Sequence, residues 1–310
     1  MATSSNFFIG TPVGIDLLAI LTQLINSLCK KIPRDCIGRC LPPLNVQRRC
    51  NSVARQWPAM PDSNVSRSFR FDRLDAIRGF AMVWMALFHF GFDLDYFGLI
   101  DEDFYRDPFW TRQRAVIVSL FLGSAGVGLA VAAAQKQPWR RFWRRWWEIA
   151  GGALLVSIGS YLVFPRSFIF FGVLHGIALM LIISRLAGRN PRHARWLAIG
   201  GAVLIALPWL VSHPFFDSRL TVWVGLFTRK PITEDFVPLL PWMGVMWWGV
   251  AAGHWMLAHR PHWLSGPLPQ RGRVVFDSLA WLGRHALSFY LLHQPVLIGS
   301  LFGLRAAGIL

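Results

Sequence analysis

Long hydrophobic runs recur along the chain from residue 79 onward, and short polar segments separate them. A helix needs roughly 20 apolar residues to cross a bilayer, and several of these runs approach that length. The third and fourth runs are short and share the tight connection Pro165-Arg166-Ser167, which indicates a helical hairpin. The pattern predicts an all-α fold, a polytopic integral membrane bundle of about seven transmembrane helices at residues 79–97, 115–134, 149–164, 168–184, 196–212, 237–257 and 286–304.

The start of the seventh span is less clear than the others. Residues 276–282 are already apolar, but Arg284 and His285 interrupt the run before it continues at Ala286. Charged and ionisable side chains are costly inside a bilayer, so we place the beginning of the span after this interruption.

Composition supports a membrane protein. Hydrophobic residues make up 54% of the chain and charged residues 15%, and many of the 16 tryptophans lie at the ends of apolar runs, as interfacial anchors do. With the start of the first span on the inside, cytoplasmic segments receive twice as many Lys and Arg residues as outer segments. The positive-inside rule therefore predicts a cytoplasmic N-terminus and an outer C-terminus.

The net charge of +16 does not indicate a nucleic-acid partner, because the basic residues are spread over segments that flank spans. Residues 139–147 interleave arginines with aromatic rings, a pattern also found in RNA-binding patches. Beside a span, such a segment is more typical of a belt that contacts anionic lipid headgroups. The expected partner is thus the lipid bilayer.

The first 66 residues differ from the rest of the chain. All four cysteines lie there, in a spacing that lacks paired Cys-x-x-Cys zinc knuckles, and Met60 offers an alternative start just ahead of Arg67. We expect residues 1–66 to be an atypical N-terminal extension, disordered or forming a loose amphipathic helix. The transmembrane domain is predicted at residues 67–310.

No dinucleotide fingerprint, P-loop, zinc-protease helix or nucleophile elbow occurs in the sequence, and we expect no metal and no tightly bound cofactor. Gly126 and Gly128 lie inside the second span, where glycines allow close helix packing. The candidates for chemistry are therefore polar residues in apolar surroundings, which are frequently functional in membrane proteins.

Three histidines meet this description: His89, His175 and His293. At 1.5 Å per residue, His89 lies near the bilayer centre, His175 roughly 9 Å from the outer face and His293 roughly 10 Å from the inner face. Arg78 precedes His89 by about three helical turns and Asp93 follows it by four residues, so the three share one helix face. Each histidine could instead simply bond a neighbouring helix and fix the packing.

The run Arg73-Leu-Asp75-Ala-Ile-Arg78-Gly79 has two compatible interpretations. As structure, it is a basic flank in which Asp75 pairs with an arginine and helps to start the helix. As function, an arginine at the cytoplasmic mouth suits the recognition of phosphate or pyrophosphate.

These motifs resemble the heparan-alpha-glucosaminide N-acetyltransferase catalytic-domain family. The resemblance extends over about residues 67–310. The first-span arginine and histidine also resemble the motif of the type-three membrane acyltransferases. The matching stretches, in order, are residues 73–82, 87–90, 93–94, 170–179, 236–244 and 282–295.

The resemblance implies an acetyl-CoA-dependent acyltransferase that moves an acyl group, acetyl above all, from cytoplasmic acyl-CoA, its co-substrate, to a sugar or glycan acceptor on the other side. His89 and Arg78 correspond to the first-span pair of the type-three enzymes. His89 would act as base or acyl carrier, and Asp93 would orient its ring. The candidates for binding acyl-CoA or for stabilising the oxyanion are Arg73, Arg78, His175, His293 and Gln294.

Two other functions remain open. A proton-coupled transporter or flippase for a small solute or lipid-linked sugar could use the histidines and Asp93 as a proton relay. The halves of the sequence show no internal symmetry, which is the usual signature of transporters. A non-catalytic scaffold in surface-polymer assembly is a third reading, and the sequence leaves open whether the chain forms homo-oligomers.

Overall fold

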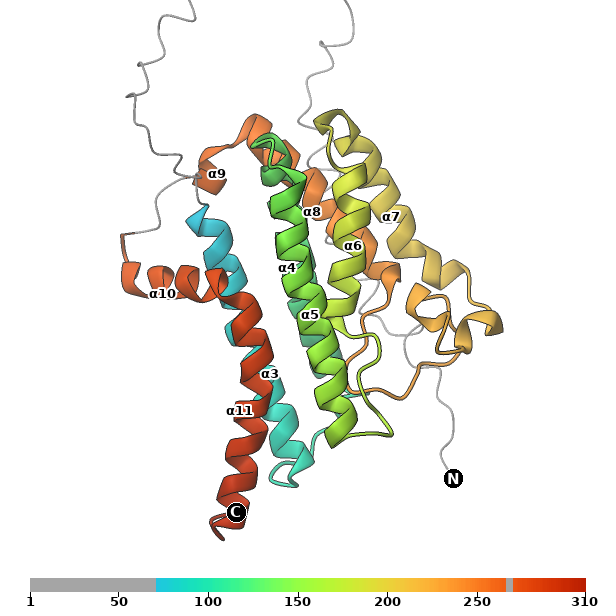
Figure 1. The fold of residues 1–310 in the computed structure, drawn as a ribbon, viewed down its shortest axis with the longest axis vertical. Coiled ribbons are helices and arrows are strands. Elements are labelled where there is room, and N and C mark those ends of the chain that lie inside the picture. Colours follow the sequence, from blue (N-terminus) through green and yellow to red (C-terminus); the bar gives the residue numbers. More distant parts are fainter. Residues whose placement is uncertain (1–70, 266–269) are drawn as a thin grey trace, which may run out of the picture. The chain divides into compact units, whose positions relative to one another are not determined.

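The computed structural model describes residues 71–265 and 270–310, so the predicted N-terminal extension lies outside the described residues. Within these ranges the chain forms helices and no strand, which confirms the all-α helical bundle (Figure 1). The α-helices are α3 (Asp72–Tyr96), α4 (Pro108–Ala134), α5 (Trp139–Val163), α6 (Val173–Ala187), α7 (Ala194–Leu210), α8 (Leu239–His259), α9 (His262–Ser265), α10 (Arg273–Arg284) and α11 (Ala286–Ala306). The 3₁₀ turns are η2 (Pro191–His193), η3 (Pro214–Asp217) and η4 (Val222–Val224).

Each of the seven predicted spans overlaps one of these helices. The fourth was placed too early, because α6 begins at Val173 and not at residue 168, so the connection after α5 is longer than the predicted turn Pro165-Arg166-Ser167. Five helices of the described part are long and apolar enough to cross a membrane: α3, α4, α5, α7 with the preceding 3₁₀ turn, and α11. The fourth predicted span corresponds to α6, a shorter apolar helix of 15 residues. The sixth corresponds to α8, whose 21 residues include four tryptophans that lower its hydropathy.

Helices α4 and α8 form the closely packed centre of the bundle. Leu122, Met246 and Val250 are fully buried there. A Cβ on Gly126 would collide with the backbone of α8 at Met246, and one on Gly253 would lie 2.7 Å from the Cβ of Ala130. The predicted role of Gly126 in close helix packing is therefore confirmed.

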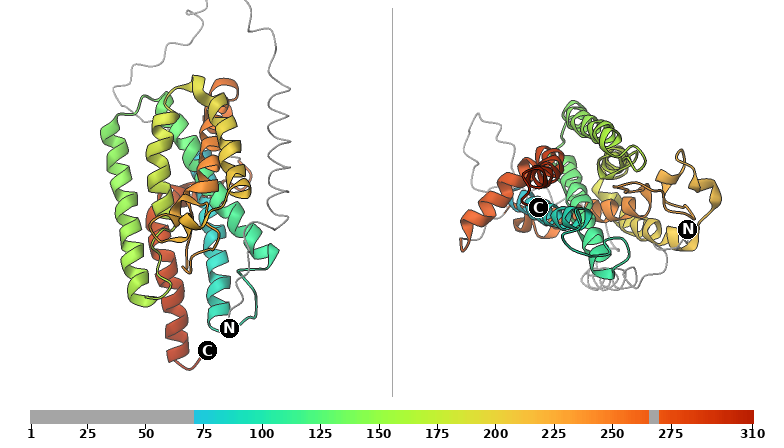
Figure 2. Two further views of the ribbon diagram at one scale, coloured as in Figure 1. Left: turned by 90° about the vertical axis from the view of Figure 1, so that its right-hand side faces the viewer. Right: turned by 90° about the horizontal axis from the view of Figure 1, so that it is seen from below.

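The interruption at Arg284 and His285 separates two helices. α10 lies across α3, and α11 follows it directly and runs alongside α3 (Figures 1 and 2). The crossing is tight, because a Cβ on Gly79 would collide with the carbonyl of Leu279 and one on Gly283 with the carbonyl of Asp75. These contacts fix the height at which α11 begins along α3.

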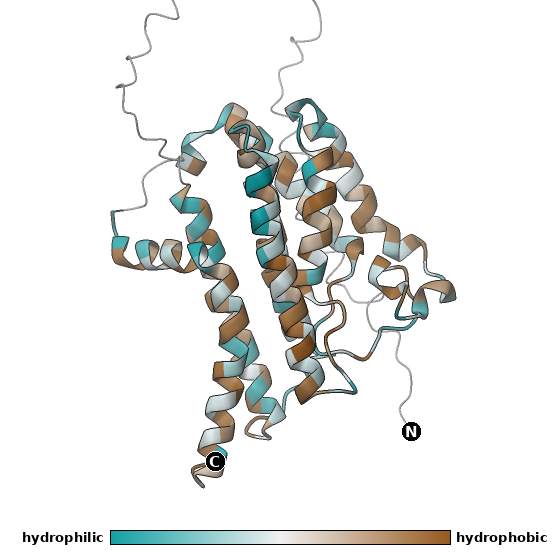
Figure 3. Ribbon diagram, viewed as in Figure 1, coloured by the Kyte–Doolittle hydropathy of each residue, from teal (hydrophilic) through white to brown (hydrophobic). Residues whose placement is uncertain are grey.

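Helix α5 changes character along its length, from hydrophilic at its Trp139 end to hydrophobic further on (Figure 3). The hydrophilic end is the predicted belt of arginines and aromatic rings. Trp146 of this belt donates a hydrogen bond to the carbonyl of Ala178 (2.8 Å), which joins α5 to α6. The belt is therefore also part of the packing between helices.

Candidate active site

His89 and His293 face each other between α3 and α11, with their ring centroids 5.2 Å apart. The register of the two helices explains the meeting. Gly79 packs against Gly283, and each histidine follows its glycine by ten residues. His89 therefore lies about 15 Å from Gly79 along α3, and His293 lies in the third turn of α11, just after the α10–α11 junction that contains Gly283. Depths counted from each predicted span separated the two rings by about 5 Å, because the sequence did not show that Gly79 and Gly283 are in contact.

The hydrogen bonds of His293 fix its tautomer. Nδ1 lies 2.8 Å from the carbonyl oxygen of Tyr290, and because a carbonyl can only accept, Nδ1 carries the proton. Nε2 of the neutral ring therefore presents a lone pair, and it is buried without a partner in the described structure. The ring stacks on Phe289 at 5.8 Å. His293 was expected to donate to an oxyanion, whereas its geometry suits a base.

Asp93 has a different partner from the one expected. Its Oδ1 accepts a hydrogen bond from Nε2 of Gln294 (2.7 Å), and no bond to His89 occurs among the described residues. The carboxylate is only 2% exposed, and its Oδ2 and the Oε1 of Gln294 are buried without partners within the described ranges. Because Gln294 adjoins His293 in sequence, Asp93 is held close to the histidine pair. We call His89, Asp93, His293 and Gln294 the histidine site.

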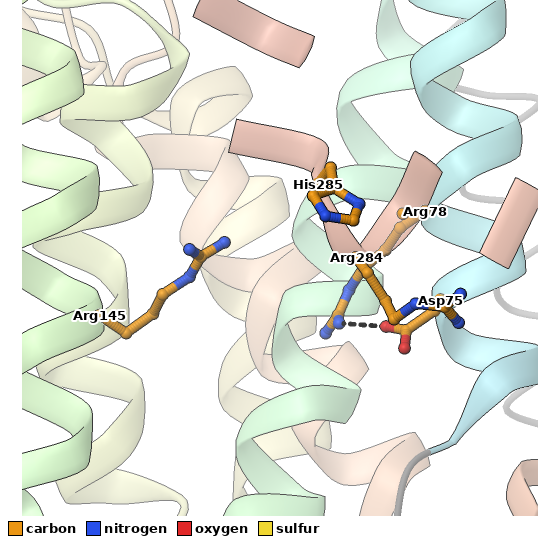
Figure 4. A pocket seen from close by; sticks show the side chains of 6 residues that line it. Asp75, Arg78, Arg145, Arg284 and His285 are labelled. Carbon is orange, nitrogen blue, oxygen red and sulfur yellow. Dashed lines mark hydrogen bonds and ion pairs between the residues drawn. The ribbon is translucent and has the colours of Figure 1, made fainter. Parts of the chain in front are cut away.

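A pocket of about 410 Å³ lies at the other end of the α3–α11 contact, and we call it the inner pocket (Figure 4). Arg145 extends from α5 toward the remaining side chains, which come from α3 and the α10–α11 junction. Three guanidinium groups thus share the pocket with a single carboxylate. The lining residues are Asp75, Arg78, Arg145, Gly283, Arg284 and His285.

Arg78 lines the inner pocket and is held there by two hydrogen bonds. It donates to Oδ1 of Asp75 (3.1 Å) and to the carbonyl of Ser124 in α4 (3.1 Å). The expected pairing of Asp75 with an arginine is confirmed. The guanidinium also covers Gly128, where a Cβ would lie 2.5 Å from Nη2. Gly128 therefore leaves room for this arginine.

Arg73 does not join Arg78. Its side chain donates to the carbonyl of His262 in α9 (3.1 Å), and it lines a second, separate pocket. Residues 73 and 78 are five positions apart, so they project from different sides of α3. The structure thus divides the two arginines that the sequence had grouped as one phosphate-binding set.

His175 stabilises the connection between α5 and α6. Its Nδ1 accepts from the backbone N–H of Gly172 (3.2 Å), so Nε2 carries the proton and donates to Oγ of Ser157 (3.2 Å). Ser157 in turn donates to the carbonyl of Ile169 (2.6 Å). Both ring nitrogens are engaged in local packing, and the described contacts of His175 do not include the histidine site.

One polar group that is linked to the histidine site, Asp235, was not identified from the sequence. Oδ2 of Asp235 accepts from the backbone N–H of Val173 (2.7 Å) and from the hydroxyl of Tyr290 (3.4 Å). Desolvation raises the pKa of Asp235, and it lowers the pKa of the nearby Lys230 to about 8. Tyr290 also holds His293 through its carbonyl, so Asp235 is linked to the histidine site. The sequence did offer one indication of this group, because Asp235 directly precedes the motif that begins at Phe236.

Comparison with known families places the chain in one family. The family model described as heparan-alpha-glucosaminide N-acetyltransferase, catalytic, matches residues 70–295, and the chain belongs to this family. The resemblance inferred from the motifs is thereby confirmed. Together with the apolar helices, the family identifies an integral membrane protein with the catalytic domain of a membrane acetyltransferase. Neither the curated proteins nor the solved structures gave a significant match.

Proposed function

We propose that this protein transfers an acyl group, acetyl above all, from cytoplasmic acyl-CoA to a sugar or glycan acceptor on the outer side of a bacterial inner membrane. The observation that carries the proposal is the pairing of His89 with His293, with an unpartnered basic nitrogen, deep between two helices of a membrane acetyltransferase domain. Histidines are the commonest general bases in catalysis.

The inner pocket is suited to the phosphates of CoA. Arg78, Arg145 and Arg284 oppose one carboxylate, Asp75, which leaves a positive balance in a volume of about 410 Å³. Guanidinium groups bind phosphate oxygens with paired, charge-assisted hydrogen bonds. The chemistry of this lining therefore fits the anionic end of the donor, on the side that the positive-inside rule assigns to the cytoplasm.

The donor then has to extend from the inner pocket to the histidine site. His285 lines the pocket directly before α11, and His293 lies eight residues further along, so the thioester must reach about 12 Å along α11. The flexible arm of CoA, which ends in the thioester, has the extended shape that such a path requires.

At the histidine site, Nε2 of His293 takes the proton of the acceptor hydroxyl or amine while the acceptor atom attacks the thioester carbonyl. A tetrahedral oxyanion forms, which an N–H of His89 stabilises. Its collapse re-forms the carbonyl, breaks the carbon–sulfur bond and releases the CoA thiolate. The thiolate receives the proton from His293, so the base returns to its neutral form and no further reactant is needed.

Asp93 and Gln294 support this cycle by electrostatics. A buried carboxylate beside the two rings favours the imidazolium that forms when His293 takes a proton. Gln294 binds one carboxylate oxygen and thereby keeps Asp93 in place. The acceptor would approach from the side of Asp235 and Tyr290, where a carboxylate and a hydroxyl can bond sugar hydroxyls.

The proposal is tested with the full chain reconstituted in liposomes. Radiolabelled acetyl-CoA is supplied on one side, and glucosamine or glucose on the other. Binding of acetyl-CoA at micromolar concentration, followed by label on the sugar, supports an acyltransferase. A protein that does not bind acetyl-CoA but moves protons together with a solute would instead be a transporter, and the proposal would fail.

A further inference from the structure

The second pocket, which we call the lipid groove, differs in chemistry from the inner pocket. Its volume of about 440 Å³ lies within the range of small-molecule sites, and its walls come from α3, α4, α8 and α9. One basic residue and two serines interrupt an otherwise apolar or glycine lining. The lining residues are Arg73, Leu74, Ile77, Ser119, Leu120, Gly123, Ser124, Val127, Met256, Trp263 and Leu264.

The groove has a basic end and an apolar end. Arg73 bonds α9 at the His262 carbonyl, and Leu264 of α9 packs with Val127, so this end lies at the start of α3. Ser119 lies eight residues before Val127 on α4, about 12 Å further into the bundle. Around Ser119 the lining holds no charged side chain, and the Ser119 hydroxyl is buried without a partner within the described residues.

We propose that this groove binds an anionic phospholipid of the inner leaflet, with one acyl chain along α4 and the phosphate at Arg73. The charge distribution supports this occupant, because a single guanidinium at the mouth of an apolar groove matches an anionic headgroup on an apolar chain. Basic pockets between transmembrane helices on the cytoplasmic side bind such headgroups. Trp263, which is 50% exposed, adds an aromatic side chain of the kind found at the headgroup level.

The position of the groove separates this lipid from the acyl donor. Ser124 belongs to the groove wall, and its carbonyl accepts from Arg78 of the inner pocket. The two pockets therefore share a wall at Ser124 and Arg78 but have different linings. A lipid in the groove would stabilise the contact between α3 and α4 that includes the hydrogen bond of Arg78.

Gly123 provides a substitution that fills the groove without disturbing the helices. A Cβ built there meets no atom within 4 Å, although the backbone of Gly123 packs closely on Gly249. Gly123→Leu should therefore place its side chain in the space that the acyl chain would occupy. Gly159→Leu is the matched control, because Gly159 of α5 also has open space around its Cβ and lies outside the groove.

The experiment is native mass spectrometry of the full chain, offered equal amounts of palmitoyl-oleoyl phosphatidylglycerol and phosphatidylcholine. Wild type and Gly159→Leu should each retain one phosphatidylglycerol, and Gly123→Leu should retain none. Arg73→Gln should weaken the binding of phosphatidylglycerol roughly fivefold, because one basic residue near the membrane surface contributes about 1 kcal/mol. Arg140→Gln should leave this binding unchanged. Thermal unfolding with added phosphatidylglycerol gives the same comparison in solution. The lipid should raise the midpoint of unfolding of wild type and Gly159→Leu, but not that of Gly123→Leu.

Three results would overturn the proposal. They are retention of the same lipid by Gly123→Leu, equal retention of the two headgroups by wild type, and absence of both bound lipid and any thermal shift. Displacement of phosphatidylglycerol by palmitoyl-CoA but not by acetyl-CoA would assign the groove to the acyl chain of a donor, and would overturn it as well.

Discussion

His89 and His293, 204 positions apart in the sequence, place their rings 5.2 Å apart because Gly79 and Gly283 bring two helices into register. The contact between the glycines lies about three helical turns from the rings. Chemistry at the histidine site therefore depends on packing at the inner pocket. The same junction supplies Arg284 and His285 to that pocket.

Gly79→Ala tests this dependence. The new methyl group would collide with the Leu279 carbonyl and push α10 away from α3, which typically costs about 1–3 kcal/mol. We expect a lower midpoint of thermal unfolding and a loss of acyl transfer larger than the loss of folded protein. Gly159→Ala, in open space on α5, should leave both unchanged or slightly raise the midpoint. Equal behaviour of the two variants would show that the α3–α10 contact does not set the site.

Arg145→Gln tests the inner pocket against a neighbouring arginine. Arg144 and Arg145 both pair with Glu148, at 3.7 Å and 2.7 Å, but only Arg145 lines the pocket. Loss of a charge-assisted bond to phosphate should raise the KM for acyl-CoA about tenfold or more, with little change in kcat. Arg144→Gln should leave KM unchanged, and steady-state kinetics in nanodiscs measures both. A similar rise of KM in the two variants would instead indicate that the basic belt attracts acyl-CoA in general.

Gln294→Leu tests how Asp93 is held. Removing the amide leaves a buried carboxylate without its 2.7 Å hydrogen bond, at a cost of about 1–3 kcal/mol. The double variant Asp93→Leu/Gln294→Leu should recover much of this stability, because neither polar group is then left unpaired. Chemical unfolding of wild type, Asp93→Leu, Gln294→Leu and the double variant in micelles measures the coupling. If the losses of unfolding free energy in the two single variants simply add up in the double variant, the hydrogen bond contributes nothing to stability.

The segment between α7 and α8 contains a pH-dependent contact. Hydrogen bonds from the Thr228 side chain (2.5 Å) and backbone (2.7 Å) hold the pKa of Asp217 below its ordinary value of 3.8. The folded state thus favours the ionised carboxylate, and this contribution to stability is present above pH 3.8 and is lost as the pH falls below it. Asp217→Asn should exchange amide hydrogens faster than wild type at Thr228 and Arg229 at pH 7. The difference should shrink in acid, and a difference that persists below the folded pKa would contradict the assignment.

The lengths of the apolar runs were sufficient to predict the long helices, whereas α9 and α10 were not predicted. Every predicted span overlaps a helix, although α6 begins five residues later than predicted, and the break at Arg284 and His285 is confirmed. The polar residues were harder to assign, because the register between distant helices depends on backbone contacts such as Gly79 on Leu279. Arg73 and Arg78 looked alike in the sequence, but the helical rotation between them directs them into two pockets.

The role of His175 could not be predicted for a related reason. A histidine at the start of an apolar run looks the same in the sequence whether it takes part in a reaction or stabilises a turn. Only the bonds to Gly172 and Ser157 distinguish the two. Asp235 was overlooked because it lies in a loop by sequence, although the fold places it against Tyr290.

The most direct test of the central claim is the rate of a single turnover of acetyl transfer in liposomes, measured for wild type, His89→Ala, His293→Ala and the double variant, with exposed His259→Ala as control. If the two rings form one catalytic unit, each single variant loses about 10²–10⁴-fold and the double variant is scarcely slower, while the control is unaffected. A wild-type rate in either single variant, at equal amounts of folded protein, would contradict it.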